Sequence, residues 1–258
     1  MPPDAVARPK GDASSFDIPR RHAVSRSVLL GFGLTLTALA GFIDAIGFIR
    51  LGGLYTSLMS GNTTQLAVAI GHGEGHTALL PCLLILAFLV GAMLGGAIAA
   101  LMSERWATPA ILAFEALAVA TAFVSAQERS HLGMAALFLS LAMGTQNAVL
   151  AHIQGFRAGT TFVTGALFAF GQKFALALAG RGPRFGWVGD GLVWLSLLVG
   201  AVAGALAHVQ LDIEALAIPA AILAVLAFWA AFVTVTSGTL TAEPPPSTPL
   251  PSRKGPRG

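Results

Sequence analysis

Charge is scarce in this chain of 258 residues, and so are the residue patterns on which most enzymes depend. Charged residues make up only 10% of the chain, too few to cover the surface of a soluble globule. The single cysteine, Cys82, excludes an intramolecular disulfide. The sequence has no Gly-x-Ser-x-Gly elbow, no P-loop and no His-Glu-x-x-His motif. We therefore expect no enzyme activity, no cofactor and no bound metal.

What the chain has in abundance is apolar sequence. Hydrophobic residues account for 55% of it, and the mean hydropathy is +0.76. Apolar runs of about 18 residues or more recur, and each is long enough to cross a hydrocarbon core roughly 30 Å thick as a helix. Strands of a membrane β-barrel would instead alternate in polarity. The composition predicts an all-α, polytopic transmembrane helical bundle whose main partner is the lipid bilayer.

The basic residues are distributed as in a membrane protein. The pI is about 9.6, but the lysines and arginines lie mainly in tails and loops, which follows the positive-inside rule and indicates no nucleic-acid surface. Residues 1–26 and 238–258 are polar and predicted to be disordered, with both termini in the cytoplasm. Residues 27–237 form the predicted membrane domain.

The membrane domain is predicted to contain two internal repeats, at about 27–126 and 131–237. Its apolar segments lie at about 27–49, 55–71, 77–102, 108–126, 131–152, 160–179, 187–208 and 215–237. Short motifs recur in the same order in both halves. Gly41-Phe-Ile-Asp-Ala corresponds to Gly144-Thr-Gln-Asn-Ala, the Gly91/Gly95 pair to Gly200/Gly204, and Pro109 to Pro219.

The number of spans depends on the segments 55–71 and 160–179. If both cross the bilayer, the chain has eight spans and the repeats run parallel. If both only enter it, there are six spans and the repeats are inverted, as in many transporters. The six-span topology places more of the fifteen basic residues on the cytoplasmic side, but segment 160–179 is long and apolar enough to span. Both topologies remain open at this point.

Asp44 is the most unusual polar residue, because it lies near the end of the first apolar segment. A carboxylate at this depth needs a proton, a cation or a set of hydrogen-bond donors. One interpretation makes Asp44 a coupling carboxylate for protons or cations. The other has Asp44 capping the following segment or pairing with Arg50. The corresponding residue of the second repeat is Asn147, which lacks the charge.

Two polar stretches follow these residues and complete the candidate solute-binding site. Ser60 to Gln65 surround one glycine with hydroxyl and amide groups, which suits a broken or re-entrant helix. The alternative is an ordinary helix start with hydrogen bonds between helices. The candidate residues are Asp44, Ser60, Gly61, Asn62, Thr63 and Thr64 in one repeat, and Gln146, Asn147, Thr164 and Gly165 in the other.

Glu115, within the fourth apolar segment, is the second candidate for a coupling carboxylate. Its alternative role is to neutralise Lys173. The Gly91/Gly95 and Gly200/Gly204 patterns allow helices to approach closely. They favour packing inside the bundle, with formation of a homo-oligomer through the same faces as the alternative.

The motifs resemble those of a known family. Gly41-Phe-Ile-Asp-Ala-Ile-Gly-Phe48 followed by Met59-Ser-Gly-Asn-Thr-Thr64 resembles the signature of the YoaK family, and residues Gly144 to Ala148 with Thr161, Thr164 and Gly165 resemble its second motif. The resemblance covers about residues 28–237. It implies a small multi-pass protein of the bacterial inner membrane and assigns no activity.

Two functional hypotheses follow. The first is a secondary transporter or permease for a small polar solute, with the two polar stretches lining one central cavity. The second is a non-transporting scaffold or partner subunit, whose polar residues only hold helices together.

Overall fold

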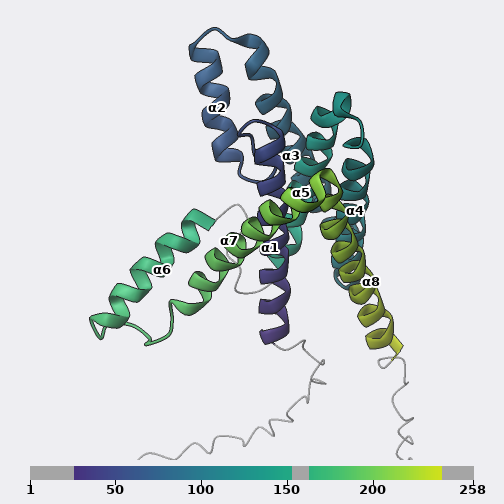
Figure 1. Ribbon diagram of the computed structural model, residues 1–258. Coiled ribbons are helices and arrows are strands. Elements are labelled where there is room, and N and C mark those ends of the chain that lie inside the picture. Colours follow the sequence, from purple (N-terminus) through teal and green to yellow (C-terminus); the bar gives the residue numbers. More distant parts are fainter. Residues whose placement is uncertain (1–25, 153–162, 240–258) are drawn as a thin grey trace, which may run out of the picture.

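The computed structural model describes residues 26–152 and 163–239, and these residues are helical almost throughout (Figure 1). Except for a residue or two at their inner ends, the two predicted tails lie outside the described residues. The apolar segments predicted from the sequence correspond, within a few residues, to helices. These are α1 (Arg26–Arg50), α2 (Met59–Gly71), α3 (Gly75–Leu101), α4 (Glu104–Ser125), α5 (Leu132–His152), α6 (Val163–Leu178), α7 (Val188–Leu211) and α8 (Ala217–Thr239), with the short 3-10 helices η1 (Arg129–His131) and η3 (Asp212–Leu216).

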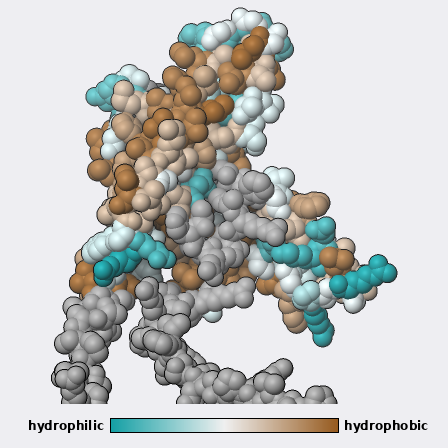
Figure 2. Space-filling view, turned by 180° about the vertical axis from the view of Figure 1, so that it is seen from behind, coloured by the Kyte–Doolittle hydropathy of each residue, from teal (hydrophilic) through white to brown (hydrophobic). Residues whose placement is uncertain are grey.

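The surface and the interior have the polarity expected of a protein in lipid. Large apolar side chains are exposed along the long helices, and Figure 2 shows apolar surface between polar ends. Nine polar or charged residues of the described chain are buried, among them Asp44, Glu115 and Gln146. A water-soluble monomer rarely exposes so large an apolar surface. The fold is a helical membrane bundle, as predicted.

The helices fall into two groups, those long enough to cross a membrane and those that are too short. By length and composition, the described residues contain five candidate membrane spans, the last of which joins α7, η3 and α8 in one apolar stretch, Val188–Thr236. In contrast, α2 has 13 residues and α6 has 16. At 1.5 Å per residue, neither reaches across a hydrocarbon core of about 30 Å.

Contacts between distant residues give the directions of the long helices. Arg50, at the end of α1, contacts Asp212, at the end of α7, so these helices run parallel. Thr234, near the end of α8, donates a hydrogen bond to the carbonyl of Arg105, at the start of α4, so α4 and α8 run antiparallel. The start of α1, the α3–α4 turn and the end of α8 lie at the same end of the bundle (Figure 1).

Two parallel helix pairs cross at glycines. In the first pair, Gly41 of α1 lies against the carbonyl of Leu197, and Gly200 of α7 lies against the carbonyl of Ala38. In the second pair, Gly144 of α5 lies against the carbonyl of Phe88, and Gly91 of α3 lies against that of Leu141. A Cβ atom at any of these glycines would overlap the facing backbone, so only glycine permits the approach.

The remaining helices are arranged around these crossings. Helix α4 packs along both α5 and α8, and the core lies between α1, α4, α5 and the start of α8. Helix α1 touches α8 only lightly, at Phe32 and Trp229, whose ring centroids are 6.4 Å apart. Helices α2 and α6 pack mainly against α3 and α7, respectively, and form two hairpins that project from the bundle (Figure 1).

The glycine crossings predict different effects on stability when two glycines of α3 are replaced by alanine. Changing Gly91 to alanine should destabilise the protein by about 1–3 kcal/mol, because the added methyl group overlaps the backbone of α5. Changing Gly96 to alanine is the matched control: nothing lies within 4 Å of its Cβ position, so the substitution should be neutral or slightly stabilising. Thermal unfolding in detergent measures both. Equal effects at the two positions would contradict the crossing geometry.

The helix directions predict the side on which the α3–α4 turn lies. Ser103 is exposed in this turn, at the same end of the bundle as the start of α1. On a Cys82→Ala background, the variant Ser103→Cys should react with an impermeant maleimide from the side that carries the N-terminal tail. Labelling of right-side-out and inside-out vesicles measures this. Reaction from the opposite side would instead support eight spans.

Candidate functional site

Asp44 binds the segment that connects α1 to α2. Its Oδ1 accepts hydrogen bonds from the Thr56 amide (2.8 Å), the Thr56 hydroxyl (2.8 Å) and the Ser57 amide (2.7 Å), and its Oδ2 accepts one from the Ser57 hydroxyl. All three residues are buried. The carboxylate therefore has donors in place of a cation, and it fixes the residues immediately before α2. The bonded amides precede Leu58, the N-cap residue of α2, so Asp44 holds the connection and does not cap the helix itself.

Two side chains of α2 hold the same connection. The amide of Asn62 donates to the Tyr55 carbonyl (2.7 Å) and accepts from the Tyr55 amide (2.9 Å). Gln65 donates to the carbonyl of Gly53 (2.8 Å), whose φ of 101° favours glycine. A Cβ at Gly61 would come within 2.8 Å of the Tyr55 ring. Asn62 and Gly61 thus shape the connection.

The hydroxyl residues of α2 have a different environment. Ser60, Thr63 and Thr64 are exposed. The Thr63 hydroxyl donates to the carbonyl of Met59 (2.8 Å) and that of Thr64 to the carbonyl of Ser60 (3.2 Å), so both bond within their own helix. Thr64 also lines a cleft of about 520 Å³ between α2 and α3. Gln65 is also exposed and lines the same cleft, so the accessible polar groups of this stretch are the hydroxyls and the Gln65 amide.

The candidate residues of the predicted second repeat lie on α5 and α6. Gln146 is buried and donates to the carbonyl of Leu36 on α1 (3.3 Å). Asn147 donates to the carbonyl of Met143 (3.2 Å) and lines a separate cleft of about 440 Å³ between α3 and α5. Thr164 is exposed near the start of α6, and Gly165 is half-buried beside it.

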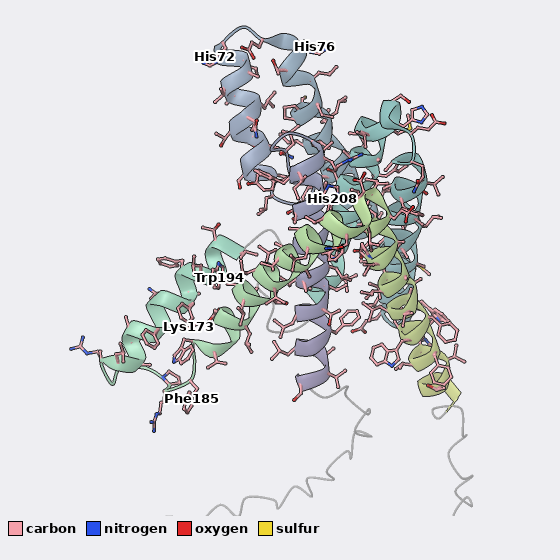
Figure 3. The ribbon with its side chains drawn as sticks, in the orientation of Figure 1. His72, His76, Lys173, Phe185, Trp194 and His208 are labelled. Carbon is pink, nitrogen blue, oxygen red and sulfur yellow. The ribbon has the colours of Figure 1, made fainter. Side chains whose placement is uncertain are left out.

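Glu115 is the second buried carboxyl group and has few polar neighbours. It is completely buried on α4 and faces the side chain of Gln146. Within the described residues, neither of its oxygens has a hydrogen bond of normal geometry. Lys173, which the sequence offered as a counter-charge, lies on α6 and pairs with Asp190 of α7 at 2.6 Å (Figure 3).

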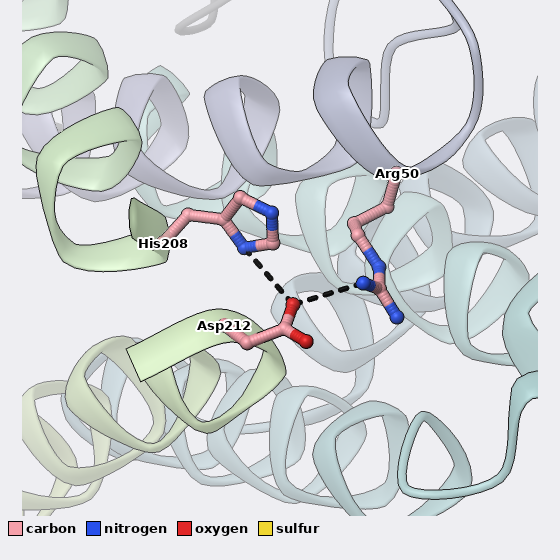
Figure 4. A network of polar contacts seen from close by, with 3 residues as sticks. All are labelled: Arg50, His208 and Asp212. Atoms are coloured by element: carbon pink, nitrogen blue, oxygen red, sulfur yellow. Dashed lines mark hydrogen bonds and ion pairs between the residues drawn. The ribbon is translucent and has the colours of Figure 1, made fainter. Parts of the chain in front are cut away.

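An ion pair that the sequence did not predict closes one end of the α1–α7 pair. The Arg50 guanidinium donates to Oδ1 of Asp212 at 2.9 Å, and Nδ1 of His208 lies 3.6 Å from the same oxygen (Figure 4). Asp212 has a φ of 50° at the junction of α7 and η3. Arg50 therefore pairs across the bundle and not with Asp44. His72 and His76, at the tip of the α2–α3 hairpin, are remote from this pair (Figure 3).

These features define a polytopic α-helical membrane protein with two glycine-mediated helix crossings and buried polar groups beside them. The chain belongs to the family described as "Protein of unknown function (DUF1275)", which matches residues 32–229. It is similar to the UPF0700 transmembrane protein RA0705 of Rhizobium meliloti (strain 1021), with 33% identity over 193 residues, covering 73% of this chain and 81% of that protein. No solved structure matches.

The hydrogen bonds of Asp44 predict a structural defect when its charge is removed. Asp44→Asn should lower the stability by about 1–3 kcal/mol, because it weakens charge-assisted bonds to Thr56 and Ser57. Ser60→Ala, at an exposed side chain on α2, serves as the control and should change the stability by less than about 0.5 kcal/mol. Thermal unfolding in detergent measures both. If Asp44→Asn were as neutral as Ser60→Ala, the carboxylate would not hold the connection.

Proposed function

We propose that this protein is a secondary transporter or permease for a small polar solute, built from two inverted repeats. The observation that carries the proposal is the correspondence between the two glycine crossings. Gly41 faces the carbonyl three residues before Gly200, and Gly200 faces the carbonyl three residues before Gly41. The pair Gly144 and Gly91 repeats this reciprocal arrangement.

The helix directions support inversion of the second half. Helix α1 starts at the end of the bundle where α8 ends, and its counterpart α5 runs towards that end (Figure 1). Helix α4 and its counterpart α8 are antiparallel. Because α2 and α6 are too short to cross the membrane, each half has three long helices. After an odd number of crossings, the second half starts from the opposite side of the membrane and is therefore inverted. Inverted repeats with interrupted helices are typical of secondary transporters.

The two halves also differ in a way that supports alternating access. Corresponding residues stand three, six and ten positions after Pro109 and Pro219. In α4 these residues are Leu112, Glu115 and Val119, each 0% exposed, and in α8 they are Ile222, Val225 and Trp229, exposed by 37%, 66% and 42%. The α4 face is sealed by α5, whereas the α8 face is open towards α1. Exchange of these two arrangements would open the opposite side of the membrane.

The exposed hydroxyls of α2 and the cleft beside Asn147 are the surfaces that we propose for solute binding, and Asp44 and Asn62 hold the α1–α2 connection beneath them. We place the protein in the bacterial inner membrane with both termini in the cytoplasm. The YoaK resemblance fits this placement, and the proposed role involves no enzymatic step.

Alternation predicts two distances between α1 and α8. Spin labels at Thr35→Cys and Val225→Cys, on a Cys82→Ala background, report on the open face, since both side chains are exposed. Double electron–electron resonance in lipid nanodiscs should show a second, shorter population, in which α8 packs on α1. Labels at Leu30→Cys and Leu195→Cys, across the glycine crossing of α1 and α7, serve as the control and should give one distance.

A single distance for the Thr35–Val225 pair, unchanged by pH and by salt concentration, would favour the static scaffold. Two distances for the control pair as well would show general loosening of the bundle and would also count against alternation.

A further inference from the structure

We propose that Glu115 is the proton-binding site of this protein, and that it takes up and releases its proton when α4 and α5 separate. The inference rests on the proposed transport function, because the separation of α4 from α5 is the second of the two alternating states. It concerns the ion that drives transport, and it selects between the two buried carboxyl groups of the described residues, Asp44 and Glu115.

The two carboxyl groups have opposite surroundings. Asp44 accepts four hydrogen bonds from the connection that it holds, so the charge of its carboxylate is compensated. Protonation of this carboxylate would weaken the bonds that hold the connection. Among the described residues, neither oxygen of Glu115 has a hydrogen bond of normal geometry, and no ion pair includes it. Burial of an uncompensated charge at membrane depth is costly. A bound proton removes this cost without any further ligand.

The surroundings of Glu115 favour a proton over a metal cation. A hard cation needs several oxygen ligands arranged around it. The neighbouring core is formed by apolar side chains such as Leu112, Val119 and Met143, and the described residues contain no cluster of three acidic, histidine or cysteine side chains. One carboxyl group beside one amide can bind and release a proton, with water as the proton donor and acceptor.

Gln146 is the positioning residue for this site. Its side chain faces Glu115 from α5, and its amide nitrogen donates to the carbonyl of Leu36 on α1. The amide can accept a hydrogen bond from a protonated carboxyl or donate one to a carboxylate. Gln146 thus connects the protonation of Glu115 on α4 to α5 and α1, one helix from each of the two glycine crossings.

Infrared difference spectroscopy tests the proposal on the full chain in an ester-free detergent, with the proton itself as the probe. The difference between spectra at low and high pH should show the C=O stretch of a buried carboxylic acid, present at low pH only. This band lies at higher frequency than that of a hydrated carboxylic acid. The band should be lost in Glu115→Gln and retained in Asp44→Asn, the matched control at the other buried carboxyl. Thermal unfolding verifies that both variants are folded.

Absence of the band in the unsubstituted protein, its persistence in Glu115→Gln or its loss in Asp44→Asn would overturn the assignment. The measurement needs no solute, so it is independent of transport. A Glu115 band in a protein with only one α1–α8 distance would refute the transport proposal and retain the proton site. Two distances without the band would refute the proton site alone.

Discussion

The close approach of helix backbones at glycine is the interaction on which the rest of the structure depends. Lipid tails are as apolar as leucine, so helices in a bilayer associate mainly through packing and hydrogen bonds. Here the pairs α1–α7 and α3–α5 bring backbone against backbone, and the α2 and α6 hairpins are attached to the bundle through α3 and α7. The crossings therefore also determine where the polar residues of α2 and α6 lie.

The same side-chain chemistry has different consequences at the two buried carboxyl groups. Asp44 lies three residues after Gly41, where α1 meets a chain connection rich in free amide and hydroxyl donors. Glu115 lies on the face of α4 that meets α5, and there the neighbours are mostly hydrocarbon. A carboxylate whose charge is compensated by many donors stabilises one fixed structure. A buried carboxyl group with few polar partners instead favours a different structure when it gains or loses its proton. Depth in the membrane alone does not separate these two roles.

The sequence predicted the helices well and the long-range partners poorly. Apolar runs bounded by glycine and polar residues located each helix within a few residues, and Gly91 and Gly200 were recognisable as packing residues. Gly41 and Gly144 stood out only as members of the repeated motif, without an indication that they pack against Gly200 and Gly91. The partners of Asp44 and Arg50 were not, because they depend on which helix faces meet. Asp212 lies far along the chain from Arg50, and Thr56 and Ser57 reach Asp44 only because the connection turns back. The isolation of Glu115 is likewise a property of the packed bundle.

The difference between the halves gives the proposed exchange a direction. When α8 closes on α1, the face that becomes buried carries Ile222, Val225 and Trp229, and its packing is independent of pH because none of these side chains is ionisable. When α5 leaves α4, the face that becomes exposed carries Glu115, and water can then stabilise its charge. Deprotonation therefore favours one state only, because the second half has an apolar residue at the corresponding position. Two identical halves would respond to protons equally and cancel, so the loss of symmetry is what allows a proton to bias the exchange.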